Sequence, residues 1–187
     1  MALPLERALT LAAAARPGVA FRLRPDEHAD ELVLLGGGEV LRLPLTPEAA
    51  TRQAVLVRAL PALRPLVPVA VPAPRYVGVL DDGLTPFTAE ARLPGIHPLL
   101  TSRQPALDGI ALGQLAGLLA ALAEIAPREA EQWGVTGAGR LRHGALDERA
   151  LLVDPQRGVL VGVVGWRPLL GDPADDLASL PSALRPH

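Results

Sequence analysis

Two short runs of alternating apolar and polar residues near the N-terminal end predict paired strands. The runs cover residues 31–35 and 39–43, and three glycines lie between them, so this segment is expected to form a β-hairpin. The glycines lack the spacing of a G-x-G-x-x-G phosphate loop. A second hairpin is predicted from residues 75–80 and 85–93, which an Asp-Asp-Gly turn joins. With a brief extended segment at residues 21–24, these runs indicate a small antiparallel sheet.

Helical spacing of apolar residues predicts three helices. The first covers residues 5–15, before a Pro-Gly pair. The second begins after Thr46, a good N-cap residue, and extends to about residue 63, with Ala50 and Ala54 near one face. The third, residues 104–126, is apolar on nearly every side, which is typical of a helix that is buried all round or lies at an interface.

The remaining segments are expected to be connectors and one further hairpin. Residues 65–74 contain four prolines and predict an extended connector, and residues 134–139 predict a Gly-rich loop. Apolar runs at residues 151–153 and 159–164 predict a third hairpin. The tail from residue 181 is too short for another substantial helix. The chain therefore reads as an α+β protein.

Composition excludes several kinds of chemistry. All 18 positively charged side chains are arginine, so a Schiff base and a phosphate-loop lysine are both excluded. The absence of cysteine excludes disulfides, thiol nucleophiles and cysteine-based zinc sites. The four histidines have no metal-ligand spacing, and no metal site is expected. A formal net charge of −2 offers no basic field for nucleic acid.

The sequence shows no signal for a membrane or for export. The N-terminus lacks the basic and apolar regions of a signal peptide, and the longest apolar stretch, residues 109–123, is too short to span a bilayer. We therefore expect a soluble cytoplasmic protein that has neither a membrane nor a nucleic acid as partner.

Five motifs follow one another along the chain. They are Val40–Pro44 with the Thr-Pro-Glu-Ala-Ala after residue 45, Phe87–Gly95, Leu115–Ala126, His143-Gly with Leu151–Asp154, and Gly171-Asp-Pro with Asp176-Leu-Ala. Their order is similar to that of the aminoglycoside phosphotransferases, kinase-like enzymes that phosphorylate antibiotics, choline, sugars and similar hydroxyl compounds. The resemblance implies a protein-kinase-like two-lobe fold, with a sheet-plus-helix lobe in residues 1–94 and a reduced helical lobe in residues 95–187.

The resemblance implies a catalytic loop that has lost its functional side chains. The family pattern His-Gly-Asp-x-x-x-x-Asn falls on His143 and Gly144, then on Ala145 and Ala150. The metal-binding Asp that usually precedes Trp falls on Gly165. In kinases these acids and this amide handle the hydroxyl proton and hold Mg²⁺ on the phosphates. We therefore expect no catalytic residue at these positions and no ordinary phosphoryl transfer.

In the first lobe the resemblance points to candidate nucleotide contacts. The phosphate-contacting cation falls on Arg42, and its usual glutamate partner falls on Gln53. Hinge contacts fall on Glu90, Arg92 and Leu93. The resemblance is compatible with ATP bound without Mg²⁺, although no cofactor is required.

Three acids and one histidine remain near the altered loop. Asp147 and Asp172 are weak candidates for a displaced catalytic acid, but a solvated loop acid and a helix-capping acid are the favoured interpretations. His143, Asp172 and Asp176 are expected to anchor the loop.

The leading hypothesis is a catalytically inactive phosphotransferase-like protein that acts by binding, as an interaction module or a ligand sensor. The alternatives are a divergent ATP-dependent phosphotransferase for small molecules and a metal-independent nucleotide sensor. Family members have helices that build the acceptor pocket in two regions. In this chain the corresponding segments, residues 127–141 and the residues after 176, are short. The apolar helix at residues 109–126 is therefore expected to be covered by a second copy in a homodimer.

Overall fold

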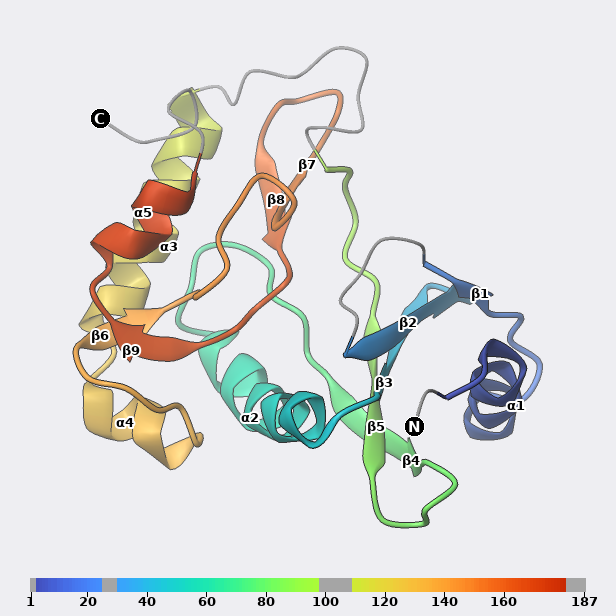
Figure 1. Ribbon diagram of the computed structural model, residues 1–187. Coiled ribbons are helices and arrows are strands. Elements are labelled where there is room, and N and C mark those ends of the chain that lie inside the picture. The colour runs from blue at the N-terminus through green and yellow to red at the C-terminus, as the bar shows by residue number, and fades with distance from the viewer. Residues whose placement is uncertain (1–2, 25–29, 98–108, 181–187) are drawn as a thin grey trace. The chain divides into compact units, whose positions relative to one another are not determined.

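The computed structural model describes residues 3–24, 30–97 and 109–180, which form two compact units (Figure 1). The first unit contains residues up to 57 together with residues 73–92. The second contains residues 58–72 and the residues from 93 onward, so the chain passes between the units three times. None of the helices in the described ranges is long and apolar enough to cross a membrane.

The first unit is built on a five-stranded antiparallel sheet, which confirms the predicted α+β class. Both predicted hairpins form, and the turn of the first is made by Gly37 and Gly38, whose φ values of 55° and 76° suit glycine. The sheet order is β1 (Arg22–Leu23), β2 (Glu31–Gly36), β3 (Glu39–Pro44), β5 (Pro86–Ala91) and β4 (Arg75–Val79).

Opposite faces of this sheet have different surroundings. One face contributes Leu34, Leu41 and Phe87 to an apolar core that includes Ala8 and Ala12 of helix α1 (Leu5–Ala15). The other face carries polar side chains that are hydrogen-bonded to helix α2 (Pro47–Leu63). This second face holds the first candidate site.

Helix α2 begins as predicted and buries a polar residue as well as apolar ones. The hydroxyl oxygen of Thr46 accepts a hydrogen bond from the Ala49 amide at 3.2 Å and so caps the helix. Ala50 and Ala54, predicted to lie near one face, are half-buried, and Leu60 and Leu63 further along the helix are buried. Gln53 is buried too, which the spacing of apolar residues does not predict.

The second unit combines helices with two small sheets. The hairpin predicted around residue 154 is present, and the predicted third helix is present from residue 109; its first residues, 104–108, lie outside the described ranges, as does the tail from 181. The sequence interpretation missed α4 and the β6–β9 pair. The elements are α3 (Gly109–Glu124), α4 (Pro127–Gln132), β6 (Arg140–Arg142) paired with β9 (Leu169–Gly171), β7 (Leu151–Val153) paired with β8 (Leu160–Val163), and α5 (Ala174–Ser179).

Helix α3 is buried along one side rather than all round. Its inner positions recur at helical spacing, and Gln114 accepts a hydrogen bond from the Leu160 amide at 3.0 Å. Ile110, with 63% of its surface exposed, lies on the outer side together with Gly113 and Ala120. The buried residues of α3 are Ala111, Leu115, Leu118 and Leu122.

Candidate functional site

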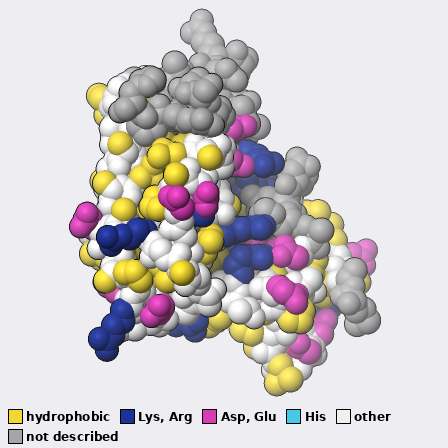
Figure 2. Space-filling model, turned by 60° about the vertical axis from the view of Figure 1, so that its left-hand side comes forward, with side chains coloured by type: hydrophobic (Ala, Val, Ile, Leu, Met, Phe, Trp, Pro, Cys, Tyr) yellow, Lys and Arg dark blue, Asp and Glu magenta, His cyan; other side chains and the backbone are white. Residues whose placement is uncertain are grey.

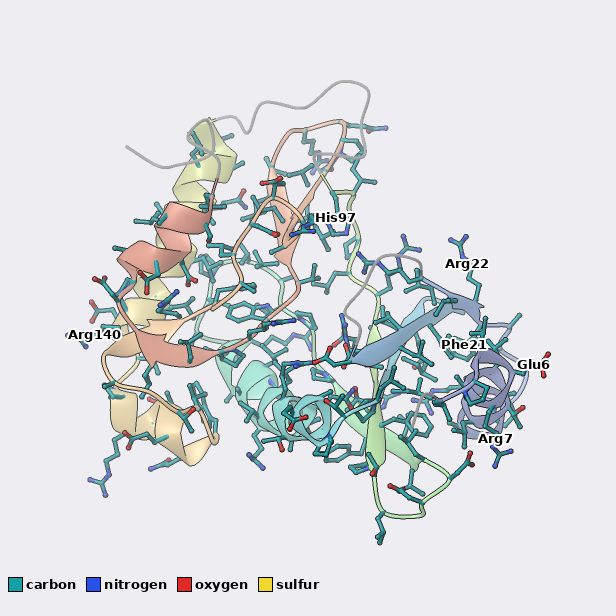
Figure 3. The ribbon with its side chains drawn as sticks, in the orientation of Figure 1. Glu6, Arg7, Phe21, Arg22, His97 and Arg140 are labelled. Carbon is teal, nitrogen blue, oxygen red and sulfur yellow. The ribbon has the colours of Figure 1, made fainter. Side chains whose placement is uncertain are left out.

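Two groups of residues carry the candidate chemistry, one in each unit. In the second unit a loop follows β6, and the buried carboxylate of Asp176 in α5 holds it. The backbone amide of His143 donates to Asp176 Oδ2 at 2.7 Å, and that of Gly144 donates to Oδ1 at 3.0 Å. Arg140, at the start of β6, points away from the unit (Figure 3), whereas the Arg142 guanidinium lies 3.6 Å from Asp176 Oδ1. Asp176 is thus an acceptor fixed within the structure.

The imidazole of His143 is fully buried and bonded at both nitrogens. Nδ1 accepts from the Ala145 amide at 3.3 Å, so the proton is on Nε2, which donates to the Val164 carbonyl at 3.0 Å. The ring lies 4.4 Å from that of Trp166, centroid to centroid. Burial lowers the pKa of His143 from 6.5 to about 4, although the hydrogen bond to Val164 opposes this shift. The ring is therefore neutral at pH 7 and serves as a hydrogen-bonded core group.

Of the positions on which the resemblance places the family's catalytic residues, Ala145 and Ala150 lie on the loop between β6 and β7, and Gly165 lies after β8. Ala145 is half-buried, and Ala150 is buried, with its carbonyl accepting from the Val164 amide at 2.8 Å. Gly165 has φ of 74°. None of these residues has a side-chain oxygen that binds a metal or accepts a proton. Within the described residues, no three His, Asp or Glu side chains are placed to hold a metal ion.

The two acids considered as displaced catalysts are engaged locally. Asp147 Oδ1 accepts from the backbone amides of Arg149 and Ala150 at 2.9 and 3.1 Å, and its Oδ2 accepts from the Arg149 guanidinium at 2.8 Å. Asp172 Oδ1 accepts from the Ala174 amide at 2.9 Å, at the first residue of α5. Both carboxylates thus complete turns, which supports the structural interpretation of each.

The first unit contains a buried charged cluster centred on Arg42. The Arg42 Nη1 donates to Glu31 Oε2 at 3.1 Å, and its Nε donates to Glu90 Oε1 at 3.2 Å. Arg42 lies on β3 between the two acids, which come from the neighbouring strands β2 and β5. The register places Arg42 opposite Val33 and Thr88, so each acid is its diagonal neighbour on the same face.

Gln53 connects this cluster to α2. Its amide nitrogen donates to Glu31 Oε1 at 2.7 Å and to the Arg42 carbonyl at 3.1 Å. The amide oxygen is buried and has no hydrogen-bond partner in the described part of the chain. A neutral amide therefore stands where the resemblance implies a helix glutamate, and Glu31 supplies the charge instead.

Sequence reasoning identified Arg42, Gln53 and Glu90 but missed Glu31. The signal was available in the hairpin register, because an acid two residues from the partner of Arg42 must share its face. Of the other predicted nucleotide contacts, Arg92 is exposed and donates its backbone amide to the Gly38 carbonyl at 2.8 Å. Leu93 belongs to the second unit.

The structure is similar to solved phosphotransferases. The GDP complex of wild-type aminoglycoside 2′-phosphotransferase-IIIa has a TM-score of 0.79 at 19% identity, covering 95% of this chain and 77% of that one. Macrolide 2′-phosphotransferase from Brachybacterium faecium has a TM-score of 0.72 at 25% identity, covering 94% and 78%. No protein-family model and no curated protein matches the sequence. The likeness confirms the predicted kinase-like fold.

We expect the burial of His143 to make stability depend on pH. Because its folded pKa of about 4 is below 6.5, the contribution of the neutral ring is complete above pH 6.5 and is lost as pH falls towards 4. The loss over this range is roughly 3 kcal/mol. Urea unfolding between pH 7.5 and 4.5 checks this: replacing His143→Gln should remove that part of the pH dependence. Equal slopes for the two proteins would contradict it, and NMR titration of the ring gives its pKa directly.

Gly144, on the loop after β6, and Gly165, on the connection between β8 and β9, should differ in their tolerance of alanine. A Cβ at Gly144 would lie 1.9 Å from the Arg167 carbonyl oxygen, whereas one at Gly165 would have no atom within 4 Å. Both have positive φ, so each change costs about 1–2 kcal/mol of backbone strain. Gly144→Ala should lower the free energy of unfolding by well over about 2 kcal/mol, because the close contact adds to the backbone strain. Gly165→Ala should lower it by no more than the strain alone. Urea denaturation measures both losses. Equal losses would show that the close contact is unimportant.

Proposed function

Because this chain has the fold of the aminoglycoside phosphotransferase family, we propose that it uses that fold for binding and not for phosphoryl transfer. One observation carries the proposal: the family's base and metal-ligand positions hold Ala145, Ala150 and Gly165. The loop around them is held by Asp176 and His143, and neither contact involves a catalytic side chain.

The energetic cost of losing the catalytic groups favours this proposal. Kinases depend on metal ions that neutralise charge on the transferred phosphoryl group, and on a residue that orients the attacking hydroxyl. The loss of one such electrostatic contact costs about 3–4 kcal/mol of transition-state stabilisation. The loss of the base and both metal ligands together would remove most of the rate acceleration. The loop still has a backbone course that hydrogen bonds to Asp176 and His143 fix, and a fixed course suits the recognition of a ligand or partner protein.

Phosphotransferase activity is the second candidate, and the similar structures support it more directly than the first, because several are named as phosphotransferases. A divergent mechanism would have to draw on Asp147 or Asp172. Each would first have to leave its present backbone partners. Several of the similar structures are GDP complexes, which supports nucleotide binding as a further candidate.

The melting temperature in the presence of nucleotide separates these candidates. We expect ATP or GTP to produce no stabilisation that depends on Mg²⁺, because the positions that the resemblance assigns to metal ligands hold Ala150 and Gly165. Stabilisation that is equal with Mg²⁺ and with EDTA would identify a metal-independent nucleotide sensor. Stabilisation only with Mg²⁺, accompanied by phosphate release, would overturn the proposal in favour of the enzyme.

Restoring the missing groups tests the alignment on which the proposal rests. Ala145→Asp, Ala150→Asn and Gly165→Asp together should create Mg²⁺-dependent stabilisation by ATP that the wild-type chain lacks. The change at Gly165 is feasible because no atom lies within 4 Å of an added Cβ and Asp tolerates positive φ better than most residues. The matched control carries Ala at position 165 with the other two changes. A triple variant that folds but gains no metal dependence would contradict the alignment.

We also propose that the chain forms a homodimer through the outer side of α3. Figure 2 brings the side of Figure 1 that carries α3, α4 and α5 forward, and apolar side chains gather on it beside charged ones. Ile110 is the large exposed apolar residue of α3. In sedimentation velocity at low micromolar concentration, Ile110→Arg should shift a dimer to monomer. The control Leu84→Arg, at an 84% exposed residue of the first unit, should not. A wild-type chain that is monomeric at this concentration would contradict the proposal.

A further inference from the structure

Helix α1 is attached to the sheet of the first unit through a small apolar area. Its buried side chains are those of Ala8 and Ala12, each a single methyl group, and its leucines are partly buried or exposed. The helix has 11 residues, and isolated helices shorter than about 12–15 residues are marginal in water. Its N-cap residue, Pro4, makes no side-chain hydrogen bond to the first turn. Helix α1 therefore depends on the sheet for its stability.

An ion pair holds each end of α1. Near its start, the Nε of Arg7 donates to Asp81 Oδ2 at 2.7 Å, in the turn after β4 (Figure 3). At its C-cap, the Nε of Arg16 donates to Glu39 Oε2 at 2.7 Å, at the start of β3. The side chains of the first pair are 50% and 43% exposed, and those of the second are 23% and 22% exposed. Salt therefore weakens both attachments.

The chain that follows α1 has an open glycine and then a close-packed segment. Gly18 has φ of 83°, and no atom lies within 4 Å of a Cβ added to it. In contrast, a Cβ added to Gly37 would lie 2.8 Å from a methyl carbon of Val19, and one added to Gly36 would lie 2.2 Å from the Ala20 carbonyl oxygen. The segment after Gly18 is thus anchored on the β2–β3 turn, so α1 can move about Gly18 while the sheet keeps its structure.

Departure of α1 would uncover an apolar face of the sheet. Leu34, Leu41 and Phe87 share one core with the two buried alanines of α1, so they lose part of their cover when the helix leaves. Asp81 and Glu39 remain beyond the two ends of the uncovered face. An apolar face between two acids suits a helix that has one apolar side and a cation near each end.

We propose that α1 is a displaceable strap, and that the sheet face beneath it docks a helix of a partner protein. The partner helix has small residues four positions apart, as α1 has in Ala8 and Ala12, because only small side chains fit where these two are fully buried. It also carries two cations that replace the arginines of α1 beside Asp81 and Glu39. This docking face belongs to the first unit, and it does not depend on the altered loop of the second.

Hydrogen exchange in the full chain tests the strap. We expect the amides of α1 to exchange at least about tenfold faster than those of β3, because α1 leaves the sheet without global unfolding. The exchange of α1 should become faster when NaCl rises from about 0.1 to 1 M, since the Debye length falls from about 10 to 3 Å. The amides of β3 should show no such change. Equal exchange of α1 and β3 at both salt concentrations would overturn the proposal.

A fluorescent peptide with the sequence of residues 3–18 is the probe for the docking face. In the full-length variant Arg7→Gln/Arg16→Gln the strap loses both ion pairs, while Asp81 and Glu39 remain. Fluorescence anisotropy should show that this variant binds the peptide about tenfold more tightly than the wild-type chain, because the face is uncovered more often. A peptide with Gln in place of both arginines should bind the same variant more weakly, since it cannot pair with the two acids.

The matched control is Arg149→Gln/Arg157→Gln, which removes two cations from exposed ion pairs of the second unit. It should leave both the exchange of α1 and the affinity for the peptide unchanged, and melting curves establish that each variant is folded. The proposal is overturned if the wild-type chain and Arg7→Gln/Arg16→Gln bind the peptide equally, or if the control raises the affinity by the same factor.

Discussion

The contact on which the second unit's loop depends is the buried carboxylate of Asp176, which accepts the backbone amides of His143 and Gly144. A carboxylate buried this deeply is stable only when hydrogen-bonded donors surround it, so α5 and the loop must be placed together. The contact uses backbone donors alone. The side chains of Ala145 and Ala150 take no part in this contact, so the course of the loop does not depend on them.

In the first unit, side chains rather than backbone amides donate hydrogen bonds to the buried carboxylates. One face of its sheet contributes apolar residues to the core beside α1, and the face toward α2 holds Glu31, Arg42 and Glu90. Buried charges of this kind are costly unless their partners are all present. Gln53 completes the arrangement and attaches α2 to it.

Local signals explain what could be predicted from the sequence. The alternating runs on either side of residues 36–38 predict a hairpin, and Thr46 predicts a helix cap. Both predictions depend only on residues that are close in the sequence, and the structure has both features. The α4 helix and the β6–β9 pair were missed because they are short and their partners are distant in sequence. Glu31 was missed for a related reason: its role depends on the register between strands. Similarly, the inner position of Gln53 follows from Glu31 and not from the periodicity of α2.

The family resemblance predicted the fold, which the structure confirms, and it predicted where catalytic residues are missing. The contacts around those positions required the structure. It is these contacts, with Asp147 and Asp172 engaged in turns, that weaken the case for a displaced catalyst. The most direct measurement of the central claim is transfer of radiolabelled γ-phosphate from ATP or GTP, with Mg²⁺, to an aminoglycoside or macrolide at high protein concentration. The account predicts labelled product no higher than in the absence of protein. Acceptor-dependent labelling that rises with protein concentration would contradict it.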